Sequence, residues 1–106
     1  MFRIFTTKEF DTDFNKLGES DKQRVTKIMK QLKEQGASIG KPLGLPYFRE
    51  KKFENKRLYF LVYREFMIVL ALGISDKKAQ QKTINRILID LDNYKEFIIK
   101  KLKEFD

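Results

Sequence analysis

The sequence contains no histidine, cysteine or tryptophan among its 106 residues, and only two prolines. Without cysteine there is no disulfide, thiolate metal site or iron–sulfur cluster, and without histidine there is no imidazole base or ligand. The N-terminus has no apolar segment of signal-peptide length, and the apolar run 58–74 carries Arg64 and Glu65 in its middle. We therefore expect a cytoplasmic protein that needs no metal or cofactor and does not enter a membrane. Its chemistry must come from Lys, Arg, Tyr, Ser or carboxylates.

Basic residues are in clear excess, with 23 Lys and Arg against 15 Asp and Glu, which gives a formal net charge of +8. The hydrophobic share of 42%, with ten Phe and four Tyr, is typical of a globular chain, and we expect one domain over residues 1–106. A basic cytoplasmic protein most often binds nucleic acid or an acidic protein. A basic but inert surface is the alternative.

The first third of the chain predicts a short strand followed by two helices. Residues 2–5 alternate as a strand does, and Thr7 can cap a helix with Phe10, Phe14 and Leu17 on one side. Residues 20–23 have the form of a capping box that opens a second helix, which Gly36 ends. Each helix has one apolar face, so the pair should form a hairpin packed on a sheet.

The remaining sequence predicts three strands and a long helix. The strands are expected at 47–53, 57–64 and 66–75, joined by short turns at 54–56 and 64–65, with a bulge at Gly73. Helical spacing returns from Asp76 over some 25 residues. The predicted fold class is α+β with the order β-α-α-β-β-β-α. An antiparallel sheet packs against the N-terminal helix hairpin, and a long C-terminal helix follows.

The positive charge is concentrated between residues 41 and 64, where seven basic residues stand against two acidic ones. Strand alternation, with a turn at 54–56, predicts that Arg49 and Lys51 share an exposed face with Arg57. Tyr59 and Tyr63 lie on the same predicted face. A face that combines basic and aromatic side chains can bind phosphates and stack bases, although a solvated basic surface would have the same sequence pattern. The opposite face should lie under the helix hairpin, and its residues are Leu58, Phe60 and Val62.

These segments resemble the RelE/ParE toxin superfamily. The resemblance lies in the loop from Lys41 to Gly44, the basic strand 48–52, the strand 56–63 and the strand 69–75, in the family's element order. It implies a RelE-like toxin of a type II toxin–antitoxin system, a metal-independent mRNA endoribonuclease that inhibits translation. The implied partners are a cognate antitoxin and mRNA on the ribosome. The alternatives are a ParE-like toxin that inhibits DNA gyrase and a catalytically inactive RelE-fold binding protein.

By position, the resemblance places Arg49 and Lys51 at the family's paired basic residues and Arg57 at its phosphate-binding arginine. The chemistry of metal-free cleavage adds Lys52 as an alternative general base to Lys51, whereas Arg49 and Arg57 would stabilise the phosphorane. Glu50 and Glu54 are alternative bases, although Glu50 is interpreted as a surface ion-pair partner. The family's later arginine and tyrosine positions carry Ser75 and Gln80 or Gln81 here. The expected RNA-binding residues are Lys56, Tyr59, Tyr63, Lys77 and Lys78.

Overall fold

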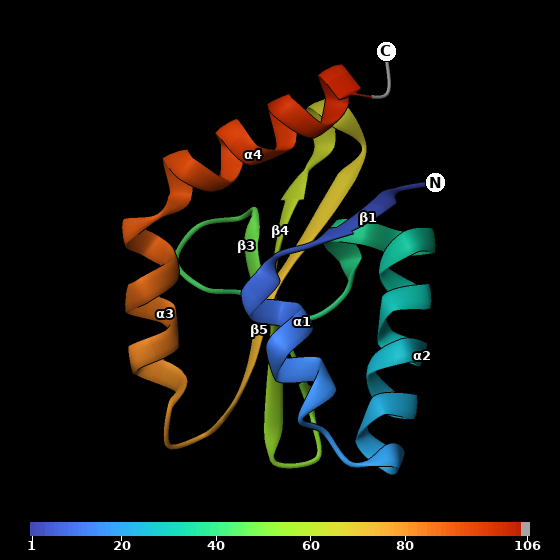
Figure 1. Ribbon diagram of the computed structural model, residues 1–106, viewed down its shortest axis with the longest axis vertical. Helices are drawn as coiled ribbons and strands as arrows, with labels where there is room; N and C mark the ends of the chain where they lie inside the picture. The colour runs from blue at the N-terminus through green and yellow to red at the C-terminus, as the bar shows by residue number, and fades with distance from the viewer. Residues whose placement is uncertain (105–106) are drawn as a thin grey trace.

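The computed structural model describes residues 1–104 and contains a five-stranded sheet with four α-helices (Figure 1). The strands are β1 (Arg3–Thr6), β2 (Lys41–Pro42), β3 (Phe48–Phe53), β4 (Lys56–Tyr63) and β5 (Ile68–Asp76). The helices are α1 (Lys8–Asn15), α2 (Glu19–Gln35), α3 (Gln80–Ile89) and α4 (Leu91–Glu104). Two short 3-10 helices lie at η1 (Gly36–Ser38) and η2 (Arg64–Phe66). The α+β class is confirmed.

The strand order in the sheet is β1-β5-β4-β3-β2. Strands β3, β4 and β5 form the predicted antiparallel meander. The register shifts between Tyr59 and Phe60, which pair with Gly73 and Ala71, so the predicted bulge lies beside Gly73. Two features were not predicted: β1 pairs in parallel with β5, and the two-residue β2 pairs with β3. The sheet is therefore mixed.

The N-terminal helix hairpin forms largely as its capping residues predict. The Thr7 hydroxyl accepts a hydrogen bond from the Phe10 amide at 3.1 Å and so caps α1. The expected capping box at Ser20 is wrong, because α2 begins at Glu19 with Gly18 as its cap, and the Ser20 hydroxyl accepts from Arg24 instead. Helix α2 ends at Gly36 with a φ of 53°.

One face of the sheet packs against α1 and α2, as predicted. Alternate residues of β4 point toward this helix pair, where they meet the apolar stripes of both helices. The buried members of this core are Phe10, Val25, Ile28, Leu32, Phe53, Leu58, Phe60, Val62, Val69 and Ala71.

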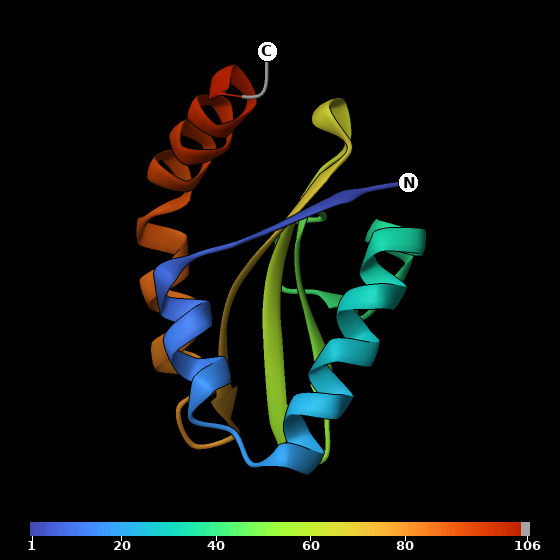
Figure 2. The same ribbon diagram turned by 45° about the vertical axis from the view of Figure 1, so that its right-hand side comes forward.

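The other face of the sheet is covered by α3 and α4, which Figure 2 shows on the opposite side of the sheet from α2. The expected single helix is interrupted at Asp90, so that Ile87 from α3 and Tyr94 and Ile98 from α4 all reach the sheet. This face is therefore a second apolar core and not an exposed surface. Among residues 1–104, no helix has both the length and the apolar character needed to cross a membrane.

A buried arginine and carboxylate at one end of the sheet: candidate functional site

The turn between β3 and β4 decides which basic residues share a face. Phe53 pairs with Lys56, so the turn contains two residues, Glu54 and Asn55, and Glu54 adopts a φ of 52°. A three-residue turn was expected. Because strand faces alternate at every residue, this difference of one residue reverses the face on which each side chain of β3 lies.

Arg49 and Lys51 therefore do not share a face with Arg57, and that prediction is wrong. They pair with Phe60 and Leu58, whose side chains lie on the α1–α2 side. Glu50 and Lys52 pair with Tyr59 and Arg57 and lie on the α3–α4 side. The residues that the structure brings beside Arg57 are thus Glu50 and Lys52.

Arg57 and Glu50 form a buried pair at the end of the sheet where β5 leads into α3. The side chain of Arg57 is 9% exposed and that of Glu50 is 2% exposed, and Arg57 Nε lies 4.0 Å from Glu50 Oε2. Two nitrogens of Arg57, Nε and Nη1, are buried and have no hydrogen-bond partner among the described residues. Buried donors without partners are uncommon and costly, and they often mark a functional site. Glu50 forms ion pairs as expected, but the expectation that it lies on the surface is wrong.

The side chains of Gln80 and Lys41 contact the Glu50 carboxylate. Gln80, at the start of α3, donates its amide to both carboxylate oxygens, at 3.3 and 3.1 Å. Lys41 on β2 places Nζ 3.5 Å from Oε1, although its side chain is 72% exposed. Beneath them, the hydroxyls of Tyr59 and Ser75 lie 2.7 Å apart. We call this set of residues the Arg57 cluster: Lys41, Glu50, Arg57, Tyr59, Ser75 and Gln80.

Exposed lysines stand on the strand and in the turn next to the Arg57 cluster. Lys52 is exposed and pairs with Arg57 across the strands. Lys77 and Lys78 are exposed in the turn between β5 and α3, where Asp76 accepts a hydrogen bond from the Ala79 amide. Lys52 therefore lies on the same side of the sheet as Arg57, and Lys77 and Lys78 follow the end of β5 at which Ser75 pairs with Arg57.

Tyr59 and Tyr63 were expected to stack bases, but both are buried in the core beneath α3 and α4. Burial raises the pKa of the Tyr59 hydroxyl, and desolvation also places the pKa of Tyr63 well above its usual range. Both phenols therefore stay protonated at neutral pH. Neither ring face is free to stack on a base, so that prediction is wrong.

The remaining predicted residues have structural contacts on the α1–α2 side. Arg49 donates to three backbone carbonyls, those of Ile39, Gly40 and Pro46, at 3.0 to 3.3 Å. It thereby holds the loop before β3. Lys56 Nζ lies 3.0 Å from Asp21 of α2, and this hydrogen bond lowers the pKa of the Asp21 carboxyl.

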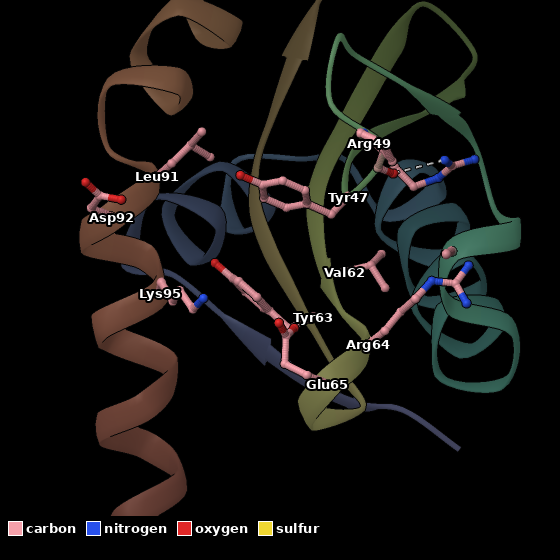
Figure 3. Close-up of a pocket in the computed structure, with 11 residues that line it drawn as sticks. Tyr47, Arg49, Val62, Tyr63, Arg64, Glu65, Leu91, Asp92 and Lys95 are labelled. Atoms are coloured by element: carbon pink, nitrogen blue, oxygen red, sulfur yellow. Dashed lines mark hydrogen bonds between the residues drawn. The ribbon is translucent and has the colours of Figure 1, made fainter.

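A separate pocket of about 730 Å³ lies at the opposite end of β4. Figure 3 shows the hydroxyls of Tyr47 and Tyr63 directed toward α4, where Leu91, Asp92 and Lys95 lie. Its lining includes neither Arg57 nor Glu50, so the pocket is distinct from the Arg57 cluster. Residues 1–104 contain no group of three or more carboxylates arranged to hold a metal ion.

Sequence reasoning considered Glu50 as an alternative base and Gln80 at a position where the family has a tyrosine, but it did not predict that Glu50, Gln80 and Lys41 meet beside Arg57. The decisive feature was the length of the turn at residues 54–55, because it determines which residues of β3 share a face with Arg57. The residue types Glu54 and Asn55 do not determine whether this turn has two residues or three. Gln80 stands just beyond the last strand, and only the bend of the chain into α3 brings its amide to Glu50.

Comparison with solved structures shows that the chain has the RelE toxin fold. The isolated RelE toxin of Escherichia coli is 17% identical, with 82% of this chain and 99% of that chain covered and a TM-score of 0.64. The intact RelBE toxin–antitoxin complex of E. coli gives 18% identity, coverage of 72% and 96%, and a TM-score of 0.64. The RelBE toxin–antitoxin complex of Mycobacterium tuberculosis gives 20% identity, coverage of 72% and 98%, and a TM-score of 0.63. No protein-family model and no curated protein matches the sequence.

Proposed function

We propose that the chain is the toxin of a toxin–antitoxin pair, and that it cleaves mRNA on the ribosome without a metal ion and so stops translation. Its partner would be a cognate antitoxin protein in the cytoplasm. The shared fold supports this proposal, because the compared structures include RelE toxins alone and in complexes with their antitoxins. Their identities of 17 to 20% leave the activity to be argued from the Arg57 cluster.

The observation that carries the proposal is the buried guanidinium of Arg57, in which two nitrogens make no hydrogen bond to the described residues. Within residues 1–104, Nε and Nη1 have no hydrogen-bond partner, because Glu50 Oε2 lies 4.0 Å from Nε, which is beyond hydrogen-bond distance. A phosphodiester supplies two oxygens that match the guanidinium fork. An RNA phosphate bound at the fork of Nη1 and Nη2 would therefore give Nη1 an acceptor that the described residues do not supply.

The surrounding charge favours a polyanion as the ligand. Lys41, Lys52, Lys77 and Lys78 are all exposed around the cluster, and the whole chain carries a net charge of +8. Lysines that contact successive phosphates give affinity without base selectivity. We assign to them the positioning of the RNA strand over Arg57.

Metal-free cleavage of RNA requires attack of a 2′-hydroxyl on the adjacent phosphorus, which adds negative charge to the phosphoryl oxygens. Arg57 stabilises that charge, and burial strengthens the effect because water is excluded. Lys52 lies directly across from Arg57 and is the cation placed to protonate the departing 5′-oxygen.

Pulse-labelling of protein and DNA synthesis within minutes of inducing the chain tests this function. The wild type should stop protein synthesis first, and Arg57→Lys should not, because it keeps a positive charge beside Glu50 but loses the guanidinium fork. Arg64→Lys is the matched control, since Arg64 is exposed and lies beyond the far end of β4. It should behave as the wild type.

Early loss of DNA synthesis with translation intact would replace the nuclease proposal with a gyrase inhibitor. Growth that continues normally under wild-type induction, with folded protein present, would overturn the toxin proposal. Full toxicity of a folded Arg57→Lys variant would remove Arg57 from the site.

A further inference from the structure

We propose that Glu50 is the catalytic base that accepts the proton of the RNA 2′-hydroxyl, and that Gln80 positions its carboxylate. This inference rests on the proposed function and adds a residue role to it. Sequence position alone favoured a lysine base, either Lys51 or Lys52. The structure directs Lys51 to the α1–α2 side and leaves Glu50 beside Arg57.

Glu50 is the carboxylate that belongs to the Arg57 cluster. Its Oε2 lies 4.0 Å from Arg57 Nε, so a phosphate bound by the guanidinium would bring its ribose next to the carboxylate. Asp76, the acidic residue at the end of β5, is exposed, and its Oδ1 accepts a hydrogen bond from the Ala79 amide at 2.9 Å. With no histidine in the chain, a carboxylate held in a defined orientation is the remaining strong candidate for this proton transfer.

The spacing of the Glu50 and Lys52 side chains along β3 suits an in-line displacement at the RNA phosphorus. Glu50 and Lys52 lie on one face of the strand, two residues and so about 7 Å apart. Arg57 pairs with Lys52 on the neighbouring strand and contacts Glu50. A phosphate on Arg57 would therefore have a proton acceptor toward one side and a proton donor toward the other.

The step balances as follows. Glu50 takes the proton of the 2′-hydroxyl while the 2′-oxygen forms a bond to phosphorus. The bond from phosphorus to the 5′-oxygen breaks, and that oxygen receives a proton from the Lys52 ammonium. The products are a 2′,3′-cyclic phosphate and a 5′-hydroxyl end, and water returns the proton from Glu50 to Lys52.

Gln80 and Lys41 control access to the carboxylate. The Gln80 amide binds both oxygens and fixes the plane of the group. Lys41 contacts Oε1 through a side chain that is 72% exposed, so it can turn to a substrate phosphate without disturbing the core. Movement of Lys41 would open one carboxylate oxygen to the ribose.

Single-turnover cleavage of a defined mRNA on programmed ribosomes tests the proposal, measured from pH 5 to pH 9 with the purified chain. Glu50→Gln should lower the rate by about a hundredfold or more, the usual loss for a general base. The wild-type rate should fall toward acid pH as the base becomes protonated, and the residual rate of the variant should lack that fall. Glu34→Gln is the matched control, because Glu34 is exposed on α2 on the other side of the sheet, and its rate should stay within about twofold of the wild type.

Gln80→Ala gives a second readout that leaves Glu50 in place. Loss of the amide donor disfavours the charged carboxylate, so the acidic fall in rate should move to higher pH. An unchanged pH profile in Gln80→Ala, or cleavage by Glu50→Gln at the wild-type rate, would overturn the role of Glu50 but not the proposed function. Absence of any cleavage by the wild type would instead overturn the proposed function.

Discussion

Gly40 sets the position of the strand edge beside the Arg57 cluster. It adopts a φ of 72°, and a methyl group added there would collide with the backbone carbonyl of Glu50. Its own carbonyl accepts a hydrogen bond from Arg49 at 3.0 Å. This close approach holds Lys41, the next residue, against the Glu50 carboxylate.

Substitution of Gly40 should therefore cost more than substitution of Gly44, which has a φ of 86° but open space around its Cα. Gly44→Ala should lower the free energy of unfolding by about 1 kcal/mol through its left-handed backbone alone. Gly40→Ala adds a steric conflict with a strand and should lower it by about 3 kcal/mol. Urea unfolding measures both, and equal losses would show that Gly40 does not contact β3 as described.

At the scale of single residues, the sequence predicted alternation along each strand but not the pairing between strands. The faces of β4 are those expected, with Leu58, Phe60 and Val62 under the helix hairpin. Pairing depends on the turn, and Glu54 adopts a positive φ that sequence propensity does not favour. One residue in the turn moved Arg49 and Lys51 away from Arg57 and brought Glu50 to it.

Among the secondary-structure elements, α4 determines how much of the sheet is exposed. Helical spacing predicted its apolar residues correctly, but the chain interruption at Asp90 and the direction of α4 depend on tertiary packing. Tyr94 and Ile98 belong to the same buried core as Tyr59 and Tyr63, which the sequence alone placed on an open face. The sequence predicted a long amphipathic C-terminal helix without assigning a surface for its apolar side. That apolar side packs against the second face of the sheet.

Ile98 and Ile99 test this packing as adjacent residues on different sides of α4. Ile98 is fully buried, whereas Ile99 is 37% exposed. Ile98→Ala should lower the free energy of unfolding by about 3 kcal/mol through lost burial and a cavity. Ile99→Ala should lower it by about 1 kcal/mol or less. A similar small loss in both variants, measured by chemical denaturation, would contradict the packing of α4 on the sheet.

Across the whole molecule, the fold separates structural charge from functional charge. On the α1–α2 side, Arg49 and Lys56 bind loop carbonyls and Asp21 and so stabilise the framework. On the α3–α4 side, Arg57 has two donors without a hydrogen-bond partner in residues 1–104, and the exposed Lys52 lies across from it on β3. The sequence predicted the basic segment and the α+β class, because both follow from local composition and periodicity. The division of that segment between two faces follows from strand register and could not be predicted in the same way.

The adjacent residues Lys51 and Lys52 provide the most direct test of where the site lies, because they point to opposite faces of β3. The measurement is the rate of mRNA cleavage on programmed ribosomes by purified Lys51→Ala and Lys52→Ala variants, each checked for an unchanged melting temperature. Lys52→Ala should lose about a hundredfold in rate through loss of the proton donor, and Lys51→Ala should stay within about twofold of the wild type. Loss of cleavage in Lys51→Ala with full activity in Lys52→Ala would place the site on the α1–α2 side and contradict the assignment to the Arg57 cluster.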